Sequence, residues 1–332
     1  MSKRVVVYGQ FTEDLETERG ILEPIGVELI DARQLDEPQL REAFRTADAV
    51  LFRRGRVTRE HIDQMGQCTI ICTYAAGYDH IDVEAASAKG IMVANTPGYG
   101  NDEVADHALT LLFALTRRLV PQVLDMAAAV ERGDIASAWN HFPYTPIRRI
   151  RGQTMGIIGL GRIGKTTAWK AQGLGMNVIA HDPYVPEEVA AERGVPLVPL
   201  DELLRRADYV VIHALLTPET NKLIGARELA LMKPSAYLIN VARGKIVDHA
   251  ALVAALQAGR IAGAGLDVVE TEPPPVELLR ELIQFPNVLV TPHNAWYSEE
   301  SITDRERIAA ENVREALQGG IPEAVVNRAA FT

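Results

Sequence analysis

Three stretches of the sequence place polar side chains directly after runs of apolar residues. Residues 240–244 (NVARG) end such a run in Arg243, residues 265–273 carry three carboxylates after small residues, and His293 follows NVLV and Thr-Pro. Arginine is a rigid bidentate donor that suits a carboxylate and its adjacent carbonyl. Histidine with a carboxylate partner gives and takes protons near neutral pH. The three stretches together indicate proton transfer at an anionic substrate.

Each of these groups also has an ordinary structural explanation. An arginine at a strand end can be a surface residue, acidic residues before a proline-rich turn are usually solvated, and most of the eight histidines belong on the surface or in satisfied core positions. The combination is more specific than any member. A cation for the substrate carboxylate and an imidazole for the proton are two of the three requirements of a carbonyl reduction, and the third is a hydride donor.

A glycine-rich turn at residues 159–164 (GLGRIG) indicates where a hydride-carrying dinucleotide binds. The apolar run 155–158 precedes it and a helix-forming stretch follows, as this motif requires. Gly159 makes the tight turn, Gly161 lets the backbone approach the pyrophosphate, and Gly164 lets the helix pack closely on the sheet. The N-terminus of the following helix then binds the phosphates.

The acidic residue that such a site uses for the ribose is found at Asp182. It closes the next predicted strand, 23 positions after Gly159. A carboxylate at this place accepts a hydrogen bond from a ribose hydroxyl and repels a 2′-phosphate. These residues therefore predict NAD rather than NADP as the cofactor. The alternative explanation is a tight turn followed by an aspartate that caps a helix.

The elements that must position these residues are alternating strands and helices, which are typical of α/β folds with doubly wound parallel sheets. A chain of 332 residues is long enough for two domains. The first predicted sheet contains Arg4 to Gly9, Val27 to Ile30, Ala49 to Arg53, Thr69 to Tyr74 and Ile91 to Asn95. The second contains Thr154 to Ile158, Asn177 to His181, Tyr209 to His213, Ala236 to Val241, Ile261 to Asp267 and Asn287 to Val290.

Two further helices are predicted outside these alternations. A long helical stretch runs from about Asn101 to Glu131, which is long enough to bridge two lobes or to form a subunit interface, and a polar amphipathic helix runs from Ser298 to Gly319. In an open parallel sheet the ligand lies outside the carboxyl ends of the strands. The three polar stretches and the glycine turn all follow predicted strands, so we expect them at such an edge.

Composition excludes several other classes of protein. A formal charge of −10, from 34 basic and 44 acidic residues, opposes binding to nucleic acid or to anionic membranes. No apolar run approaches the 18 or so residues of a membrane span, and the N-terminus turns polar too soon for a signal peptide, so we expect a cytoplasmic protein. Cys68 and Cys72 have neither redox nor zinc spacing and are predicted to be buried thiols. No metal site is predicted.

The motifs resemble those of the D-isomer-specific 2-hydroxyacid dehydrogenases over nearly the whole chain. The matching segments are AAGYDHIDVEAA, GIMVANTPG, EVADHAL, GIIGLGRIG, LINVARGKIVDHAAL, GAGLDVVETEP and TPHNAW. The resemblance implies that the protein interconverts a 2-oxo acid and a D-2-hydroxy acid with NAD. Arg243 would bind the substrate, His293 would be the acid/base, and Glu272 would be its carboxylate partner.

The resemblance also implies roles for other residues. The backbone amides of Ala76 and Gly77 would hold the substrate carboxylate. The residues expected to bind the cofactor are Gly159, Gly161, Arg162, Ile163, Gly164, Asp182, Ala214, Thr217, Thr220, Val241, Ala242, Arg243, Asp267 and His293.

The domain organisation follows from the resemblance and not from composition. A Rossmann domain for NAD, at 99–297, would be inserted into a flavodoxin-like substrate domain made of 1–98 and 298–332. Members of the family are typically dimers with the long helix at the interface, so we expect a homodimer. A small 2-oxo or 2-hydroxy acid would be the other partner.

Within the family, TPHNAWYSEES and EVADHAL are most similar to the subgroup of the C-terminal binding proteins, the NAD-binding corepressors. In this subgroup an aromatic residue at the place of Trp296 lines the substrate pocket; the alternative is an interface or core tryptophan. The chain departs from the subgroup at Thr73, where the corepressors carry arginine, and has Ala75 where many family members have glycine. The similarity to the corepressors makes an NAD(H)-sensing scaffold with vestigial catalysis the alternative function.

Three arginines follow the third predicted strand, where related enzymes contact the distal end of the substrate. One of Arg53, Arg54 and Arg56, with Arg54 as our choice, could bind a second anionic group such as a phosphate or carboxylate. The alternative is a solvated basic turn.

Overall fold

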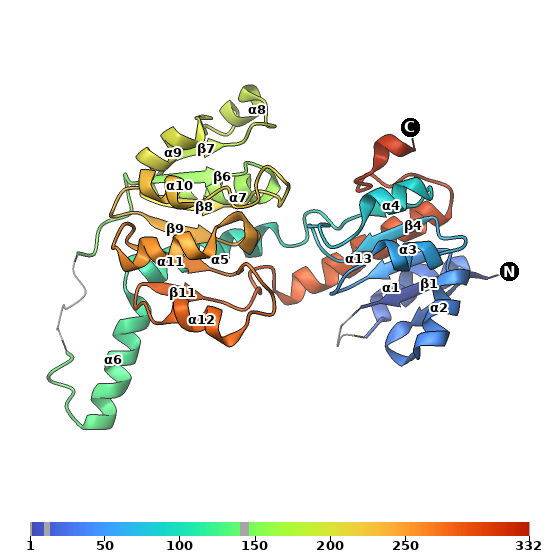
Figure 1. Cartoon of the computed structure of the whole chain (residues 1–332), viewed down its shortest axis with the longest axis horizontal. Coiled ribbons are helices and arrows are strands. Elements are labelled where there is room, and N and C mark those ends of the chain that lie inside the picture. Colours follow the sequence, from blue (N-terminus) through green and yellow to red (C-terminus); the bar gives the residue numbers. More distant parts are fainter. Residues whose placement is uncertain (1, 10–13, 140–145, 332) are drawn as a thin grey trace. The chain divides into compact units, whose positions relative to one another are not determined.

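The computed structural model describes residues 2–9, 14–139 and 146–331. The chain divides into two compact units, of which unit 1 comprises Met1–Gly100 and Tyr297–Thr332 and unit 2 comprises Asn101–Trp296. Each unit contains a parallel sheet with helices around it (Figure 1). This arrangement confirms the predicted α/β class with two doubly wound sheets.

The sheet of unit 1 has the strand order β2-β1-β3-β4-β5, and all of its strands are parallel. This is the flavodoxin-like order. The strands follow one another in one direction across the sheet from β1 to β2 and in the other direction from β3 to β5. The strands are β1 (Lys3–Tyr8), β2 (Val27–Asp31), β3 (Ala49–Phe52), β4 (Ile70–Thr73) and β5 (Met92–Ala94).

The core of unit 1 lies on both faces of this sheet. Val5 and Val7 of β1 pack on one face with residues of α1 and α13, whereas Val6 packs on the other with residues of α2, α3 and α4. Successive side chains of a strand point to opposite faces, so an uninterrupted run of valines serves a strand that is buried on both sides. The helices are α1 (Glu16–Leu22), α2 (Glu37–Thr46), α3 (Arg59–Gln64), α4 (Val83–Ala88) and α13 (Glu299–Leu317).

The sheet of unit 2 has the order β11-β10-β9-β8-β6-β7, again all parallel. Beyond β7, Leu197 forms an isolated parallel bridge with Ala180. Counted as a minimal strand, this segment completes the Rossmann order. Pro196 and Pro199 flank it, and proline cannot donate to a ladder, which explains why the sequence did not predict a strand there. The strands are β6 (Thr154–Ile158), β7 (Asn177–His181), β8 (Tyr209–Ile212), β9 (Tyr237–Asn240), β10 (Gly263–Leu266) and β11 (Val288–Val290).

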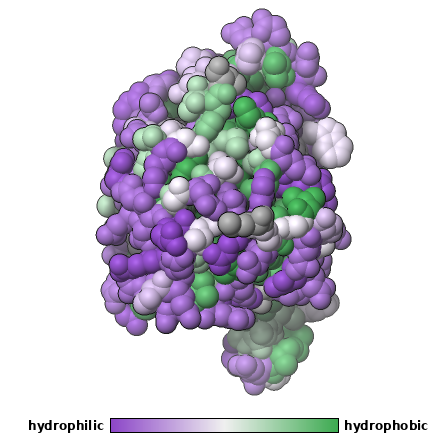
Figure 2. All heavy atoms as spheres, turned by 90° about the vertical axis from the view of Figure 1, so that its right-hand side faces the viewer, coloured by the Kyte–Doolittle hydropathy of each residue, from purple (hydrophilic) through white to green (hydrophobic). Residues whose placement is uncertain are grey.

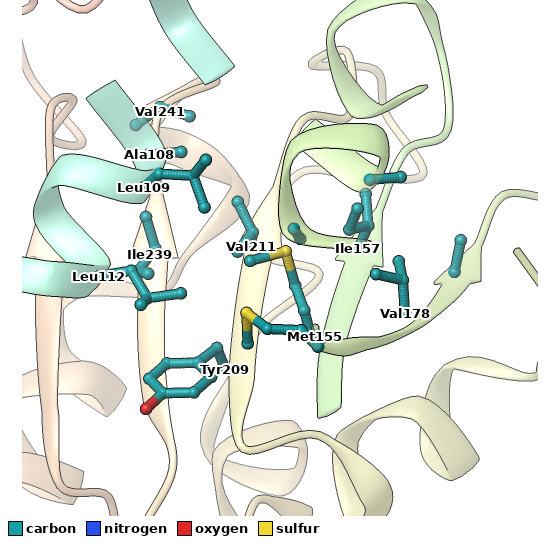
Figure 3. Close-up of a cluster of buried hydrophobic side chains, with 14 of the residues drawn as sticks. Ala108, Leu109, Leu112, Met155, Ile157, Val178, Tyr209, Val211, Ile239 and Val241 are labelled. Atoms are coloured by element: carbon teal, nitrogen blue, oxygen red, sulfur yellow. The ribbon is translucent and has the colours of Figure 1, made fainter. Parts of the chain in front are cut away.

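Helices cover both faces of this second sheet. On one face, Leu109 and Leu112 of α5 point toward the strands that carry Val211 and Ile239 (Figure 3). On the other face, a separate apolar cluster joins the sheet to α9, α10, α11 and α12. The helices are α5 (Asn101–Thr116), α6 (Leu119–Arg132), α7 (Arg162–Gly173), α8 (Glu187–Ala191), α9 (Leu200–Arg206), α10 (Ala226–Leu231), α11 (His249–Gln257) and α12 (Val276–Ile283).

The predicted single helix from Asn101 to Glu131 is wrong, because the structure has two helices there, α5 and α6. Arg118 lies between them with φ = 53°, in the left-handed region. In a continuous helix the ring of Pro121 would collide with the carbonyl of Arg117, and proline has no N–H to donate to it. The break places Pro121 in the first turn of α6, where proline is tolerated.

The remaining predictions about the fold concern the surface and the cysteines. Cys68 and Cys72 are both buried free thiols, as predicted. On the face shown in Figure 2, hydrophilic residues predominate and hydrophobic residues lie between them in small groups. Within the described ranges, no helix is both long enough and apolar enough to cross a membrane.

Candidate active site

The carboxyl ends of the strands of unit 2 meet at one edge of its sheet, and the loops after all six strands carry predicted site residues. The glycine turn follows β6, which lies between β7 and β8 where the strand order changes direction. The loops after β9, β10 and β11 carry Arg243, Glu272 and His293. Ligands of open α/β sheets bind at such a switch point.

Two glycines of the turn are required by close backbone contacts. A Cβ on Gly159, whose φ is +92°, would lie 2.6 Å from the backbone nitrogen of Ala214. A Cβ on Gly164 would lie 2.2 Å from the carbonyl oxygen of Gly159. Any side chain at these two positions would push the turn away from the loop after β8 or from α7.

Gly161 has a different environment, which fits the phosphates of a dinucleotide. A Cβ on Gly161 would have no heavy atom within 4 Å, so the space before the N-terminus of α7 is open. Arg162 and Ile163 are the first residues of this helix, whose early N–H groups have no acceptor within the helix and attract anions. An anionic pyrophosphate can approach the backbone here without meeting a side chain at position 161.

Asp182 holds the glycine turn through its carboxylate. Its Oδ2 accepts a hydrogen bond from the backbone N–H of Leu160 at 2.8 Å, and its Oδ1 accepts one from Tyr184 at 2.9 Å. A carboxylate has about four acceptor positions, so these two bonds leave room for a ribose hydroxyl. Asp182 thus supports the glycine turn and does not cap a helix, which was the alternative explanation, and its negative charge opposes a 2′-phosphate.

The predicted residues after β8 shape their own loop. The N–H of Thr217 donates to Thr220 Oγ1 at 2.8 Å, and the Thr220 hydroxyl donates to the carbonyl of Leu215 at 2.6 Å. These bonds fix a tight turn that follows Ala214, the residue in contact with Gly159. The two threonines therefore fix the shape of the loop that follows Ala214.

His213, just before this loop, is a buried neutral histidine. Burial lowers its pKa to about 3, because the charged imidazolium would lose its hydration. Its Nε2 lies 2.9 Å from Thr167 Oγ1 on α7, and its Nδ1 is buried without a hydrogen-bond partner in the part of the chain that the structure describes.

The turn that carries Arg243 is held by Asn240, a residue that the sequence analysis did not single out. The buried Asn240 side chain accepts a hydrogen bond from Ala242 N–H at 3.1 Å and donates one to the carbonyl of Arg243 at 2.9 Å. The signal that could have found it is an asparagine that ends an otherwise apolar strand. This turn also contains Val241, so three predicted residues depend on one amide side chain.

Gly244 brings this turn against the loop that carries Glu272. A Cβ on Gly244 would lie 1.9 Å from the carbonyl carbon of Val269, so only glycine fits. The N–H of Val269 in turn donates to Glu272 Oε1 at 3.1 Å. The loops after β9 and β10 are thus packed together next to the carboxylate.

His293 and Glu272 form the predicted acid and base pair. His293 Nδ1 lies 2.5 Å from Glu272 Oε2, and the two side chains are 43% and 33% exposed. Because Nδ1 is bonded to the carboxylate, Nε2 is the nitrogen that can exchange a proton with a substrate. His293 has φ = 55°, in the left-handed region that only a few per cent of residues other than glycine adopt.

Asp267 organises the loop around His293. Its buried carboxylate accepts hydrogen bonds from the Thr291 hydroxyl at 2.6 Å and from the N–H groups of Asn294 and Ala295 at 3.1 and 2.9 Å. The indole N–H of Trp296 donates to the carbonyl of His293 at 3.1 Å. Asp267 was predicted to contact the cofactor, and the structure gives it this additional structural role.

The predicted substrate residues Ala76, Gly77 and Arg54 lie in unit 1, in the loops after β4 and β3. The side-chain amide of Asn95 donates to the carbonyl of Ala76 at 2.7 Å, which fixes the loop after β4. Gly77 is buried and Ala76 half-buried, whereas Arg54 is exposed.

Arg53, one of the three arginines considered for a distal anionic group, is buried inside unit 1, where it pairs with two carboxylates. The Arg53 side chain is 3% exposed, and its Nη2 lies 2.8 Å from Glu18 Oε1 and 3.0 Å from Glu306 Oε1. The guanidinium carbon also lies 4.3 Å from the ring centroid of Tyr74. Two carboxylates hold this guanidinium inside unit 1, because burying a charge requires opposite charges beside it.

Comparisons with known proteins agree with this geometry. Residues 109–295 match the model of the NAD binding domain of the D-isomer specific 2-hydroxyacid dehydrogenases. This segment contains the glycine turn, Arg243, Glu272 and His293.

Similar proteins are found by sequence and by structure. D-3-phosphoglycerate dehydrogenase of Methanocaldococcus jannaschii is 40% identical over 92% of this chain, which spans 56% of that relative's length. Glyoxylate reductase of Thermococcus litoralis is 39% identical over 88% of this chain and 87% of its own length. The structure of D-lactate dehydrogenase from Aquifex aeolicus, complexed with NAD and lactic acid, has a TM-score of 0.80, 28% identity and 96% coverage of both chains.

Proposed function

The chain belongs to the D-isomer-specific 2-hydroxyacid dehydrogenase family, and we propose that it uses NAD to interconvert a 2-oxo acid and the corresponding D-2-hydroxy acid. The observation that carries this proposal is the contact of His293 Nδ1 with Glu272 Oε2, at the same sheet edge as Arg243 and the glycine turn. This arrangement supports proton transfer, anion binding and cofactor binding at one edge.

The acid and base chemistry belongs to His293. In the reductive direction, the imidazolium donates its Nε2 proton to the oxygen of the substrate carbonyl, and in the oxidative direction the neutral ring accepts the hydroxyl proton. Glu272 holds the Nδ1–H and stabilises the charged ring. The protein keeps the ring in place through the loop that Asp267 binds.

Arg243 binds the substrate carboxylate and polarises the carbonyl. Its backbone is fixed by Asn240, and its planar guanidinium can form two parallel hydrogen bonds to an anion. At the carboxyl edge of unit 1, the backbone amides of Ala76 and Gly77 are proposed to bind a substrate carboxylate, as the resemblance implies. Trp296 is proposed to line the substrate pocket.

The cofactor residues fit a dinucleotide, whose nicotinamide supplies or accepts the hydride. We propose that the open space at Gly161 and the N-terminus of α7 bind the pyrophosphate. Asp182 binds a ribose hydroxyl and makes NAD the preferred form over NADP. Ala214, Thr217, Thr220, Val241, Ala242 and Asp267 complete the proposed cofactor site.

The substrate is proposed to be a small 2-oxo acid. Two of the relatives named above are a glyoxylate reductase and a D-3-phosphoglycerate dehydrogenase, and only the second name includes a phosphate group. Arg54 is exposed after β3, and we propose that it binds a distal anionic group when the substrate carries one. The names of these relatives define the range of 2-oxo acids to test.

We also propose that the protein is a homodimer in which a second copy covers α6. This helix extends away from the sheet of its unit (Figure 1). It carries exposed apolar side chains at Leu119, Val120, Val123, Leu124 and Val130. An exposed apolar stripe of this kind marks an interaction surface. Light scattering should show a dimer, and replacing Val123 and Leu124 by glutamate should give a monomer; a wild-type monomer would contradict the proposal.

An assay of NADH oxidation with a panel of 2-oxo acids tests the proposed function. The panel contains glyoxylate, pyruvate, hydroxypyruvate, phenylpyruvate, oxaloacetate and phosphohydroxypyruvate, with NADPH as the control cofactor. We expect turnover with at least one acid, the D-hydroxy acid as product, and a preference for NADH. If no acid is reduced while NADH binds tightly and promotes assembly, the corepressor-like scaffold is the better description.

A further inference from the structure

The loop that carries His293 is connected to helix α5 through a chain of hydrogen bonds. His107 of α5 places its Nε2 2.9 Å from Thr291 Oγ1 and 3.5 Å from Asp267 Oδ1. The Asp267 side chain is 1% exposed and that of His107 21% exposed. All three residues lie in unit 2, although 184 positions separate His107 from Thr291.

The direction of these hydrogen bonds follows from the number of protons available. The Thr291 hydroxyl has one proton, and it donates this proton to Asp267 Oδ1 at 2.6 Å. This short distance is typical of a hydroxyl that donates to a carboxylate. Thr291 Oγ1 must therefore accept from His107, which carries a hydrogen on Nε2. The chain runs from His107 to Thr291 to Asp267.

The far end of this chain determines the backbone on either side of His293. Asp267 accepts hydrogen bonds from the N–H groups of Asn294 and Ala295, and its own carbonyl accepts one from His293 N–H at 2.9 Å. Left-handed backbone at a residue like His293 is strained and persists only where its surroundings impose it. Here the Asp267 carboxylate, held in one orientation, imposes the left-handed backbone at His293.

Helix α5 is a rigid support for this chain. Its Leu111 lies so close to β10 that a Cβ on Gly265 would be 3.0 Å from the Leu111 Cβ. His107 lies one turn before Leu111 on this helix, and Asp267 directly follows β10. The imidazole therefore approaches the carboxylate from a helix packed on the same strand.

We propose that His107 is a positioning residue for the acid/base histidine, acting through Thr291 and Asp267. It sets the angle at which His293 meets Glu272 and presents Nε2 to the substrate. The proposal rests on the proposed function, because it takes His293 as the group that transfers the proton. His107 itself does not touch the reacting atoms.

Two pairs of variants at the two ends of the hydrogen bond test this role. His107→Phe keeps a ring but has no donor, whereas His107→Gln supplies an N–H near the place of Nε2. Thr291→Val removes the hydroxyl and Thr291→Ser keeps it. We expect Phe and Val to lower kcat by about tenfold or more, because small misplacements of catalytic groups have effects of this size. His107→Gln and Thr291→Ser should keep most of the wild-type kcat. The Kd of NADH should stay within about twofold of the wild-type value in all four variants.

A double variant separates positioning from a general structural role. In the His293→Asn background, His107→Phe should lower kcat no further, because residues that act as one unit have non-additive effects. The inference is overturned if His107→Phe leaves kcat unchanged, if His107→Gln loses as much as His107→Phe, or if the loss is the same in both backgrounds. If His293→Asn alone keeps wild-type kcat, the proposed function fails first, and that result is distinguishable from the other three.

Discussion

His293 Nδ1 and Glu272 Oε2 lie 2.5 Å apart although 21 positions separate the two residues. They meet because β10 and β11 are parallel neighbours, so the loops after both strands leave the sheet at the same edge. Glu272 Oε1 is fixed separately by the N–H of Val269. The orientation of the carboxylate therefore does not depend on the imidazole alone. A carboxylate that is fixed in this way holds its histidine partner in one tautomer.

Replacing Glu272 by glutamine should lower kcat by about 100-fold, because general acid and base catalysis contributes at least this much and the neutral amide cannot stabilise the imidazolium. Steady-state reduction of the best acid of the panel measures it. Glu270→Gln is the matched control, since this nearby carboxylate pairs with Lys222. Equal losses in both variants would show that local charge, and not the pair with His293, is responsible.

Replacing Arg243 by alanine should raise KM and lower kcat together, with kcat/KM reduced by about 100-fold or more, equivalent to about 3 kcal/mol. Arginine binds the carboxylate and polarises the carbonyl at once, so both parameters depend on it. Lys245→Ala removes an exposed charge two positions away and should have little effect. An Arg243→Ala variant with wild-type kcat and KM would remove this residue from the site.

Arg54→Ala should distinguish charged from uncharged substrates. We expect kcat/KM for phosphohydroxypyruvate to fall by about tenfold, the effect of one charge-assisted hydrogen bond, while that for pyruvate stays constant. Arg59→Ala, which removes a basic side chain at the start of α3, is the control. Equal kcat/KM changes for the two acids would favour the solvated basic turn.

His213 should make the protein less stable in mild acid. Its pKa is about 3 in the folded protein because of burial, and about 6.5 in the unfolded chain. Between these values the unfolded chain binds more protons, so the free energy of unfolding falls as pH falls. From pH 8 to pH 5 the loss from this group is at most about 2 kcal/mol.

Urea unfolding of the wild type and of His213→Gln at both pH values measures this contribution. The glutamine variant should lose less stability between pH 8 and pH 5, whatever its stability at pH 8. The same pH dependence in both proteins would show that His213 is not a buried neutral group.

The strand ends were predictable because they depend on local patterns. The run that ends in Arg243, the one that ends in Asp267 and the one before His293 each become a strand, and parallel topology brings their ends to one edge. The glycine turn was equally readable, since Gly159 and Gly164 have the close contacts that the motif predicts.

Other features depend on contacts that no local pattern contains. The hydrogen bond from His107 to Thr291 joins α5 to the end of β11, and Arg53 reaches a carboxylate of α13, Glu306, 253 positions away. A basic residue after a strand can equally face a substrate or a buried carboxylate, and only the packing of α1 and α13 decides this for Arg53. The break between α5 and α6 at Arg118 could have been predicted from Pro121. The apolar periodicity on both sides of it favoured one continuous helix instead.

Reduction of the best panel acid by NADH, measured for the wild type and for His293→Asn, tests the central claim most directly. Asparagine keeps a polar side chain but cannot transfer the proton. We expect kcat to fall by about 1000-fold or more, while the variant still binds NADH, as followed by the fluorescence of NADH. Near-normal turnover by this variant would contradict the assignment of His293 as the acid/base residue, and with it the proposed mechanism.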